Sequence, residues 1–160
     1  MTDKKTKITA EPEKQELFVS RDFDAPMEIV MRAHTDPKLF VRWFGCRGMT
    51  TKTEHFEAKT GGRYKLLQNM GGQEFSSYGV FHEVTHDRIV KTMEFGGYPG
   101  HVALETIRFE ALPGNKTRLV TQSVFQSVTD RDGVVKSGFE KGAGESHDQL
   151  SELLVELKTT

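Results

Sequence analysis

The sequence predicts an α+β fold in which one long terminal helix lies across one curved antiparallel sheet. Residues 139–157 carry apolar side chains at the three- and four-residue spacing that forms a stripe along one side of a helix. The stripe consists of Phe139, Ala143, Leu150, Leu153, Leu154 and Leu157, and His147 lies along it. Upstream, short apolar runs are separated by turn signals, and consecutive strands with short connections favour an antiparallel meander. We therefore expect the long helix to pack against this sheet.

Two glycines are unusual inside the predicted long helix. Gly142 and Gly144 each cost roughly 1 kcal/mol relative to alanine in a helix interior. A helix that tolerates such a cost often needs its backbone close to another surface. We expect that surface to be the sheet.

Length and composition indicate a single soluble domain. The chain has 160 residues, of which 36% are hydrophobic and 28% are charged. We divide it into a polar arm over residues 1–14 and one domain over residues 15–160. The formal net charge of -1, with no basic run among the aromatic residues, argues against nucleic acid or an acidic membrane as the partner.

The sequence also predicts a cytoplasmic protein. Cys46 is the one cysteine, so an internal disulfide is excluded, which fits a reducing compartment. No apolar run approaches the roughly 18 residues of a membrane span. The first residues, Met-Thr-Asp-Lys-Lys-Thr-Lys, lack the apolar region of a signal peptide.

The amino-terminal part of the domain predicts one strand followed by two short helices. Residues 16–23 have the composition of a strand. Pro26 suits the start of a helix whose buried side carries Ile29, Val30 and Ala33. The Thr-Asp-Pro sequence at 35–37 ends this helix and starts another over residues 38–44, with Asp36 as its cap. The polar arm is expected to be solvated, with a short edge strand at residues 7–11 as the alternative.

Six more strands follow, which makes about seven in total. Their predicted ranges are 50–58, 63–69, 75–85, 88–95, 101–111 and 116–125. Glycine pairs separate several of them, because glycine accepts the positive φ of tight turns. Ser127 resembles a helix cap, and Gly133 with the Ser137-Gly138 pair is expected to divide the last region into a short helix and the long one.

Seven motifs in order carry a family resemblance. They are Arg21-Asp-Phe-Asp-Ala-Pro26, Thr35-Asp-Pro37, Arg42-Trp-Phe-Gly45, Gly61-Gly-Arg-Tyr64, Gly79-Val-Phe-His-Glu83, Arg88-Ile-Val90 and Ser137-Gly-Phe-Glu140. Together they resemble the START-like (SRPBCC) superfamily. The branch they resemble most is the carboxy-terminal domain of the activator of the heat-shock-protein-ninety ATPase. The resemblance covers everything beyond the polar arm.

The resemblance implies a helix-grip fold, in which a bent antiparallel sheet wraps around the long helix. It also implies a hydrophobic cavity between the two, which relatives use for lipids, polyketides, hormones or other apolar molecules. Trp43 and Tyr64 match recurrent aromatic positions, and Phe81 and Phe139 lie in the motifs. These four side chains either line a ligand cavity or simply fill the core.

The histidines offer no metal site, because none has the spacing of zinc ligands and only one cysteine is present. His34 and His147 lie on the buried sides of their helices. Either they are polar groups of the cavity wall that bind a ligand or move a proton, or they are core histidines with satisfied hydrogen bonds, which we favour. Glu83 shares a face with Phe81 in a regular strand and is expected to form an ion pair with a basic residue such as Arg63 or Arg88.

Three functions remain as hypotheses at this point. The first is the binding of an apolar or amphipathic small molecule by His34, Trp43, Tyr64, Phe81, Phe139 and His147, without a cofactor. The alternative is a co-chaperone-like module that stimulates a chaperone ATPase. The second alternative is an enzyme like the cyclases or dehydratases of the superfamily, with His34, His147 or Tyr64 as acid or base. No catalytic residue is assigned, and we favour a protein without catalysis.

Overall fold

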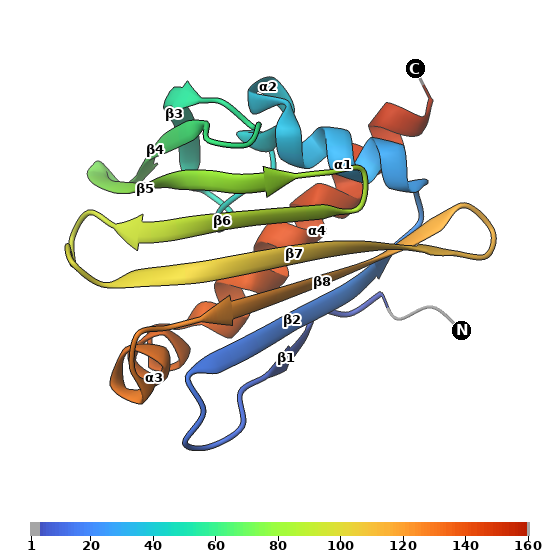
Figure 1. Ribbon diagram of the computed structural model, residues 1–160. Helices are drawn as coiled ribbons and strands as arrows, with labels where there is room; N and C mark the ends of the chain where they lie inside the picture. Colours follow the sequence, from blue (N-terminus) through green and yellow to red (C-terminus); the bar gives the residue numbers. More distant parts are fainter. Residues whose placement is uncertain (1–3, 160) are drawn as a thin grey trace.

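The computed structural model describes residues 4–159, which form one eight-stranded antiparallel sheet and four helices. The strands are β1 (Lys7–Thr9), β2 (Glu16–Phe23), β3 (Thr50–Phe56), β4 (Arg63–Met70), β5 (Gln73–Val84), β6 (Arg88–Phe95), β7 (Val102–Leu112) and β8 (Lys116–Val124). Their order across the sheet is β1-β2-β8-β7-β6-β5-β4-β3, so β3 to β8 form a meander and β2 joins it beside β8. Figure 1 shows the sheet in front of the last helix.

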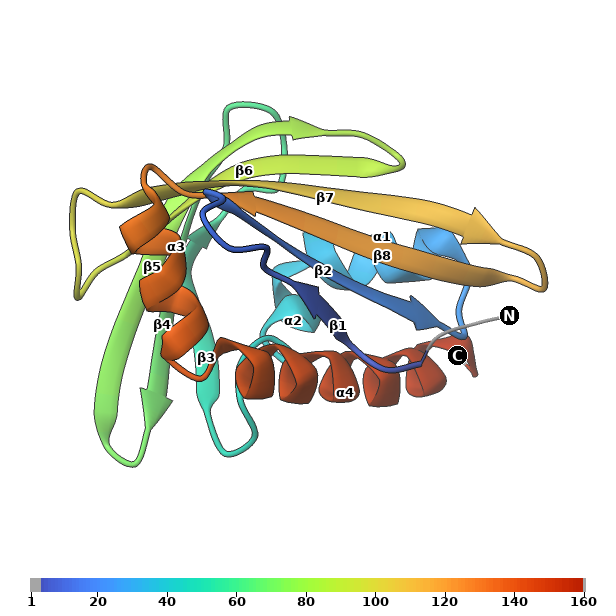
Figure 2. The same ribbon diagram turned by 90° about the horizontal axis from the view of Figure 1, so that it is seen from below.

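The helices are α1 (Met27–Thr35), α2 (Pro37–Phe40), α3 (Val128–Lys136) and α4 (Phe139–Lys158). Figure 2 shows α4 running along one side of the sheet, which bends around it. The strands β3, β4 and β5 turn toward the amino-terminal end of α4, whereas α1 lies near its other end. This arrangement confirms the predicted α+β helix-grip fold.

The sheet has one strand more than predicted. β1 pairs antiparallel with β2, and Ile8 lies opposite Val19. Ile8 also packs against the apolar cluster that contains Leu17 and Val19. The edge of β2 offers backbone hydrogen-bonding groups, and a short strand with one apolar side chain can use them. The alternative prediction of a short edge strand at residues 7–11 is therefore confirmed for residues 7–9, in place of an unstructured arm there, and residues 1–3 of the arm lie outside the described part of the chain.

Two helix boundaries also differ from the prediction. α2 ends at Phe40 rather than at residue 44, because the next N–H groups, those of Arg42 and Trp43, donate to carbonyl groups three residues back and so form turns instead of an α-helix. Gly133 lies inside α3 and does not break it. The break lies at the Ser137-Gly138 pair, where Gly138 has a φ of 85°, a left-handed conformation that glycine adopts without strain. Asp36 and Ser127 cap α2 and α3 as predicted.

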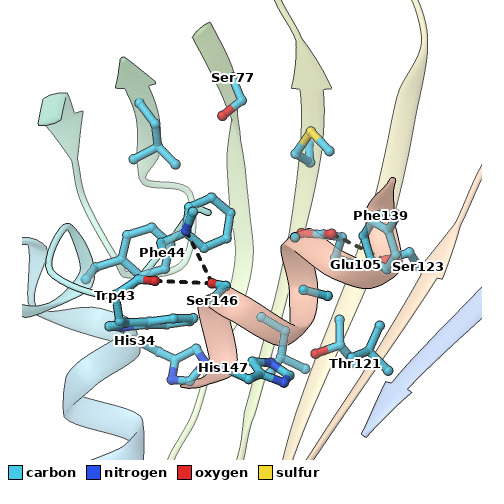
Figure 3. A pocket seen from close by; sticks show the side chains of 18 of the residues that line it. His34, Trp43, Phe44, Ser77, Glu105, Thr121, Ser123, Phe139, Ser146 and His147 are labelled. Carbon is cyan, nitrogen blue, oxygen red and sulfur yellow. Dashed lines mark hydrogen bonds between the residues drawn. The ribbon is translucent and has the colours of Figure 1, made fainter. Parts of the chain in front are cut away.

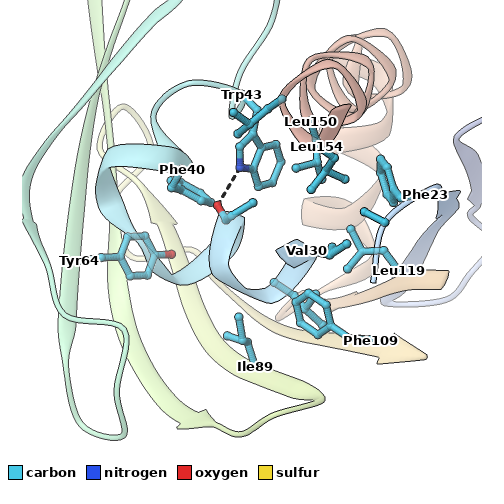
Figure 4. Packing of buried hydrophobic residues seen from close by; sticks show 14 of the residues in the cluster. Phe23, Val30, Phe40, Trp43, Tyr64, Ile89, Phe109, Leu119, Leu150 and Leu154 are labelled. Atoms are coloured by element: carbon cyan, nitrogen blue, oxygen red, sulfur yellow. Dashed lines mark hydrogen bonds between the residues drawn. The ribbon is translucent and has the colours of Figure 1, made fainter. Parts of the chain in front are cut away.

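The main apolar core lies between the carboxy-terminal half of α4, helix α1 and the sheet. Figure 4 shows Leu150 and Leu154 of α4 facing the same interior as Val30 of α1 and Leu119 of β8. All four side chains are almost completely buried. Leucines of this size fill the space between helix and sheet, as the predicted stripe requires.

The amino-terminal half of α4 is different, because three of its cavity-facing residues, Gly142, Ala143 and Ser146, are small. The prediction that Gly142 and Gly144 bring the helix backbone against the sheet is wrong. A Cβ atom added at Gly142 would lie 3.3 Å from Sγ of Cys46, which belongs to the loop after α2, and one added at Gly144 would meet no described atom of another element within 4 Å. Gly142 is therefore close to this loop rather than to the sheet, and Gly144 is close to neither.

Candidate functional site

The candidate site is a cavity of about 390 Å³ between the amino-terminal half of α4 and the inner face of the sheet. From α4 it is lined by Phe139, Gly142, Ala143, Ser146 and His147. The cavity exists because glycine, alanine and serine are too short to reach the sheet, whereas the leucines one and two turns further along do reach it. Figure 3 shows this cavity from close by.

The loop after α2 forms one wall and is fixed to α4 by hydrogen bonds. Nε2 of Gln149 donates to the carbonyl oxygens of Trp43 at 3.1 Å and Gly45 at 2.7 Å. Oγ of Ser146 donates to the Trp43 carbonyl at 3.3 Å and accepts from the backbone N–H of Gly45 at 3.2 Å. Arg47 forms an ion pair with Glu152. These contacts hold the wall at a defined distance from the helix.

Trp43 connects this wall to α1 and the core. Its indole Nε1 donates to the carbonyl of Ala33 at 2.9 Å, and its side chain is buried. Its ring lies 4.8 Å from that of His34 and 5.2 Å from that of Phe40, measured between centroids. An aromatic side chain with its polar atom paired in this way is held in one orientation at the cavity.

His34 is buried and has a structural hydrogen bond. Its Nδ1 donates to the carbonyl of Val30 at 2.8 Å, because a carbonyl oxygen can only accept. Burial lowers the pKa of His34 to about 3, although the Val30 bond opposes this, and the positive charge of Lys91 lowers it further. The ring is therefore neutral at physiological pH.

His147 is also buried and lines the cavity from α4. Its Nδ1 lies 3.1 Å from Oγ1 of Thr6, and its ring packs edge-on against Phe23 at 5.5 Å. Burial lowers the pKa of His147 to about 4, and the nearby guanidinium group of Arg21 contributes in the same direction. An acid or base catalyst works best with a pKa near the working pH, so both histidines favour the structural interpretation over proton transfer.

The remaining predicted residues lie around the same cavity. The hydroxyl of Tyr64 donates to the carbonyl of Thr92 at 2.6 Å, and burial, with the negative charge of Glu105, raises the pKa of Tyr64. Phe81 is buried, with its ring 5.3 Å from that of Tyr64, and Phe139 is half-buried. The cavity thus brings together His34, Trp43, Tyr64, Phe81, Phe139 and His147. Their role in binding stays a prediction.

A polar row on the inner face of the sheet was not predicted. Lys91, Glu105 and Ser123 lie directly opposite one another on β6, β7 and β8, and all three line the cavity. Nζ of Lys91 lies 4.0 Å from Oε1 of Glu105, and Oγ of Ser123 donates to Oε2 of Glu105 at 3.3 Å, as Figure 3 shows. Burial lowers the pKa of Lys91, although the carboxylate of Glu105 opposes this. The alternation of Ile89, Lys91 and Met93 was the available signal, since it places all three on one face.

Glu83 lies outside the cavity lining, in an ion pair. Glu83 accepts a hydrogen bond from Nε of Arg88 at 2.6 Å and forms the ion pair predicted for it. A β-bulge separates it from Phe81, so the two do not follow a regular alternation.

Within residues 4–159, the acidic, histidine and cysteine side chains form no cluster of three that could bind a metal ion. In the same part of the chain, every helix is too short or too polar to cross a membrane.

A bent antiparallel sheet that wraps around a carboxy-terminal helix is the helix-grip architecture of the START-like proteins. Within this class, the model of the family described as "Activator of Hsp90 ATPase homolog 1-like protein" matches residues 24–155. The chain therefore belongs to this family, which confirms the resemblance that the motifs indicated. No curated protein matches the chain.

Several solved structures share the fold. A protein from Arthrobacter aurescens is 23% identical with a TM-score of 0.86, and the alignment covers 94% of this chain and 91% of that one. A protein from Mycobacterium smegmatis is 18% identical with a TM-score of 0.86, covering 96% and 99%. A protein from Chromobacterium violaceum is 26% identical with a TM-score of 0.77, covering 88% and 96%. These similarities show the common fold.

Proposed function

We propose that this protein binds an apolar or amphipathic small molecule in the cavity between the sheet and α4, without a cofactor. The cavity itself carries the proposal. Its volume of about 390 Å³ falls within the range of roughly 300–1,000 Å³ that is typical of ligand pockets. Rings of Trp43, Phe44, Phe81 and Phe139 line it, and aromatic side chains provide large contact areas for apolar ligands.

The energetics of packing support the same proposal. Protein interiors are close-packed, and an unfilled volume loses the dispersion contacts of the atoms around it. A single larger side chain in place of Ala143 would occupy part of this space. The chain keeps small residues there and fixes the opposite wall with hydrogen bonds from Ser146 and Gln149. A ligand that enters would supply the missing contacts.

The test uses the tryptophan emission of the protein as an internal probe. Trp43 is the single tryptophan of the chain and lines the cavity. We expect long-chain alcohols, fatty acids or sterols to change its emission and to displace a bound environment-sensitive dye. For each compound, both effects should occur over the same range of concentration. If no lipid-like compound displaces the dye or changes the emission, small-molecule binding is excluded as the function.

Replacement of Ala143 by phenylalanine should block the cavity. We expect Ala143→Phe to weaken dye binding at least tenfold, about 1.4 kcal/mol, because the ring occupies the space that the ligand needs. The matched control is Lys141→Phe, which places the same ring on an exposed position of α4 and should leave binding unchanged. Circular dichroism checks that both variants keep the fold. If the dye binds Ala143→Phe as tightly as the unaltered protein, the dye binds outside the cavity.

The family match favours one other function, the co-chaperone-like stimulation of a chaperone ATPase. This function needs a protein surface rather than the cavity, so the two are separable by experiment. We expect the ATPase rate of Hsp90 to remain unchanged when the protein is added in excess. A rate that increases with the added protein, and equally with Ala143→Phe, would instead support the co-chaperone function.

A further inference from the structure

The inner polar row indicates which ligands the cavity accepts, and this inference rests on the proposed function. We propose that the cavity selects a ligand with a neutral hydroxyl group at its polar end, held between Lys91 and Glu105. The hydroxyl oxygen accepts a hydrogen bond from the Lys91 ammonium, and the hydroxyl proton is donated to Oε1 of Glu105. The apolar part of the ligand then lies against the aromatic rings and the small residues of α4.

The ammonium group of Lys91 is buried without a close acceptor. The residue is 7% exposed and lines the cavity. Among residues 4–159 the structure gives Nζ no hydrogen bond, and the carboxylate oxygen of Glu105 lies 4.0 Å away, beyond the roughly 3.2 Å limit of an ordinary N–H···O bond. The faces of Tyr64 at 4.8 Å and Phe40 at 5.5 Å compensate part of its charge. Three N–H donors therefore remain available.

The two carboxylate oxygens of Glu105 have different surroundings. Oε2 accepts the hydrogen bond of Ser123, whereas Oε1 is the atom that faces Lys91. A gap of 4.0 Å between the ammonium and Oε1 is too long for a direct hydrogen bond, but one oxygen that bonds both groups can bridge it. A hydroxyl group fits this position, since it is both donor and acceptor.

The charges decide between a hydroxyl group and the other polar ends of lipid-like molecules. Glu105 already balances the positive charge of Lys91, so a ligand carboxylate would bring a second negative charge into a site of low dielectric constant. A ligand ammonium would place a second positive charge beside that of Lys91 in the same site. A carbonyl group accepts from Lys91 but cannot donate to Glu105. Among these four polar ends, the hydroxyl group satisfies both partners without a net charge.

The experiment compares three probes with one ring system and different polar ends. These are naphthalenemethanol, naphthoate and methylnaphthalene, titrated at neutral pH with the emission of Trp43 as the readout. We expect naphthalenemethanol to bind at least tenfold more tightly than each of the other two. Equal or tighter binding of methylnaphthalene or naphthoate overturns the hydroxyl selectivity but leaves small-molecule binding intact. If none of the three binds and the dye is also not displaced by lipids, the proposed function itself fails.

Two variants test the assigned partners. Glu105→Gln removes the competing negative charge, so naphthoate should gain at least tenfold and become the preferred probe. Lys91→Met removes the donor, so naphthalenemethanol and methylnaphthalene should then bind within twofold of each other. The matched control is Glu110→Gln, an exposed carboxylate on the same strand, which should leave all three affinities unchanged. Unaltered preferences in both Glu105→Gln and Lys91→Met would overturn the assignment, and circular dichroism verifies that each variant is folded.

Discussion

Acidification from pH 7 to pH 5 is expected to lower the free energy of unfolding by about 4 kcal/mol, because two buried histidines remain neutral in the folded chain. Burial holds the pKa of His34 at about 3 and that of His147 at about 4. An unfolded histidine has a pKa of about 6.5. Each residue therefore destabilises the fold by about 1.4 kcal/mol for each pH unit below that value, which gives about 2 kcal/mol per histidine at pH 5.

The free energy of unfolding decreases with falling pH because the unfolded state binds more protons than the folded state. Below about pH 6.5 the unfolded chain takes up protons at both histidines, while the folded chain does not until the pH approaches the lowered pKa values. The stabilisation by neutral His34 and His147 is thus complete above pH 6.5 and falls as the pH decreases. The loss ends near pH 4 for His147 and near pH 3 for His34, where the folded state also binds the proton.

Urea unfolding at a series of pH values measures this effect. His147→Gln should remove about half of the decrease between pH 7 and pH 5, since glutamine keeps a polar group near Thr6 but does not titrate. The control is His86→Gln, because the His86 side chain is 84% exposed in the folded chain and is in water in both states. A free energy of unfolding that stays constant down to pH 5 would contradict the neutral, buried state of the two histidines.

The fold could be predicted from the sequence because its signals are local and agree with one another. The glycine pairs and the Pro113-Gly114-Asn115 turn separate segments with strand composition, and the structure places β2 and β6 at the predicted ranges of 16–23 and 88–95. The leucine stripe of residues 139–157 predicts α4 in the same way. Order and type of these elements are set by short-range pattern, and the family motifs then indicate how they pack.

The cavity depends on information that local pattern lacks. Gly142 and Gly144 predict close contact between the helix and the sheet, whereas Gly142 lies close to Cys46 of the loop after α2 and Gly144 lies close to no other element, and only the tertiary arrangement decides between these cases. Lys91 lies within a strand, and its importance depends on β6 being paired so that Glu105 lies opposite. Register between strands is a tertiary property, so the polar row could not be derived from either strand alone.

The two halves of α4 therefore contribute differently to the protein, although the sequence shows them as one continuous apolar stripe. Its carboxy-terminal leucines stabilise the fold, and its amino-terminal small residues leave room for the candidate ligand. Trp43 lies at the boundary, since it packs in the main core and also lines the cavity. Its replacement should consequently change stability and binding together.

Replacement of Trp43 by alanine is expected to lower the free energy of unfolding by about 3–5 kcal/mol, the usual cost of removing a large buried aromatic side chain. Trp43 is 4% exposed, and alanine would also lose the hydrogen bond to Ala33 and the ring contacts with His34 and Phe40. The wall that Ser146 and Gln149 fix would then border a larger void, which limits any compensating collapse.

Urea unfolding followed by far-ultraviolet circular dichroism measures this loss, because the variant has no tryptophan emission. Trp43→Phe keeps a ring in the core but no indole N–H, so its destabilisation should lie between those of the unaltered protein and Trp43→Ala. The exposed aromatic residue Tyr98, which is 55% exposed, provides the control, and Tyr98→Ala should change stability by no more than about 0.5 kcal/mol. A Trp43→Ala variant as stable as Tyr98→Ala would mean that the loop after α2 contributes little to the core, and the fixed cavity wall would have to be abandoned with it.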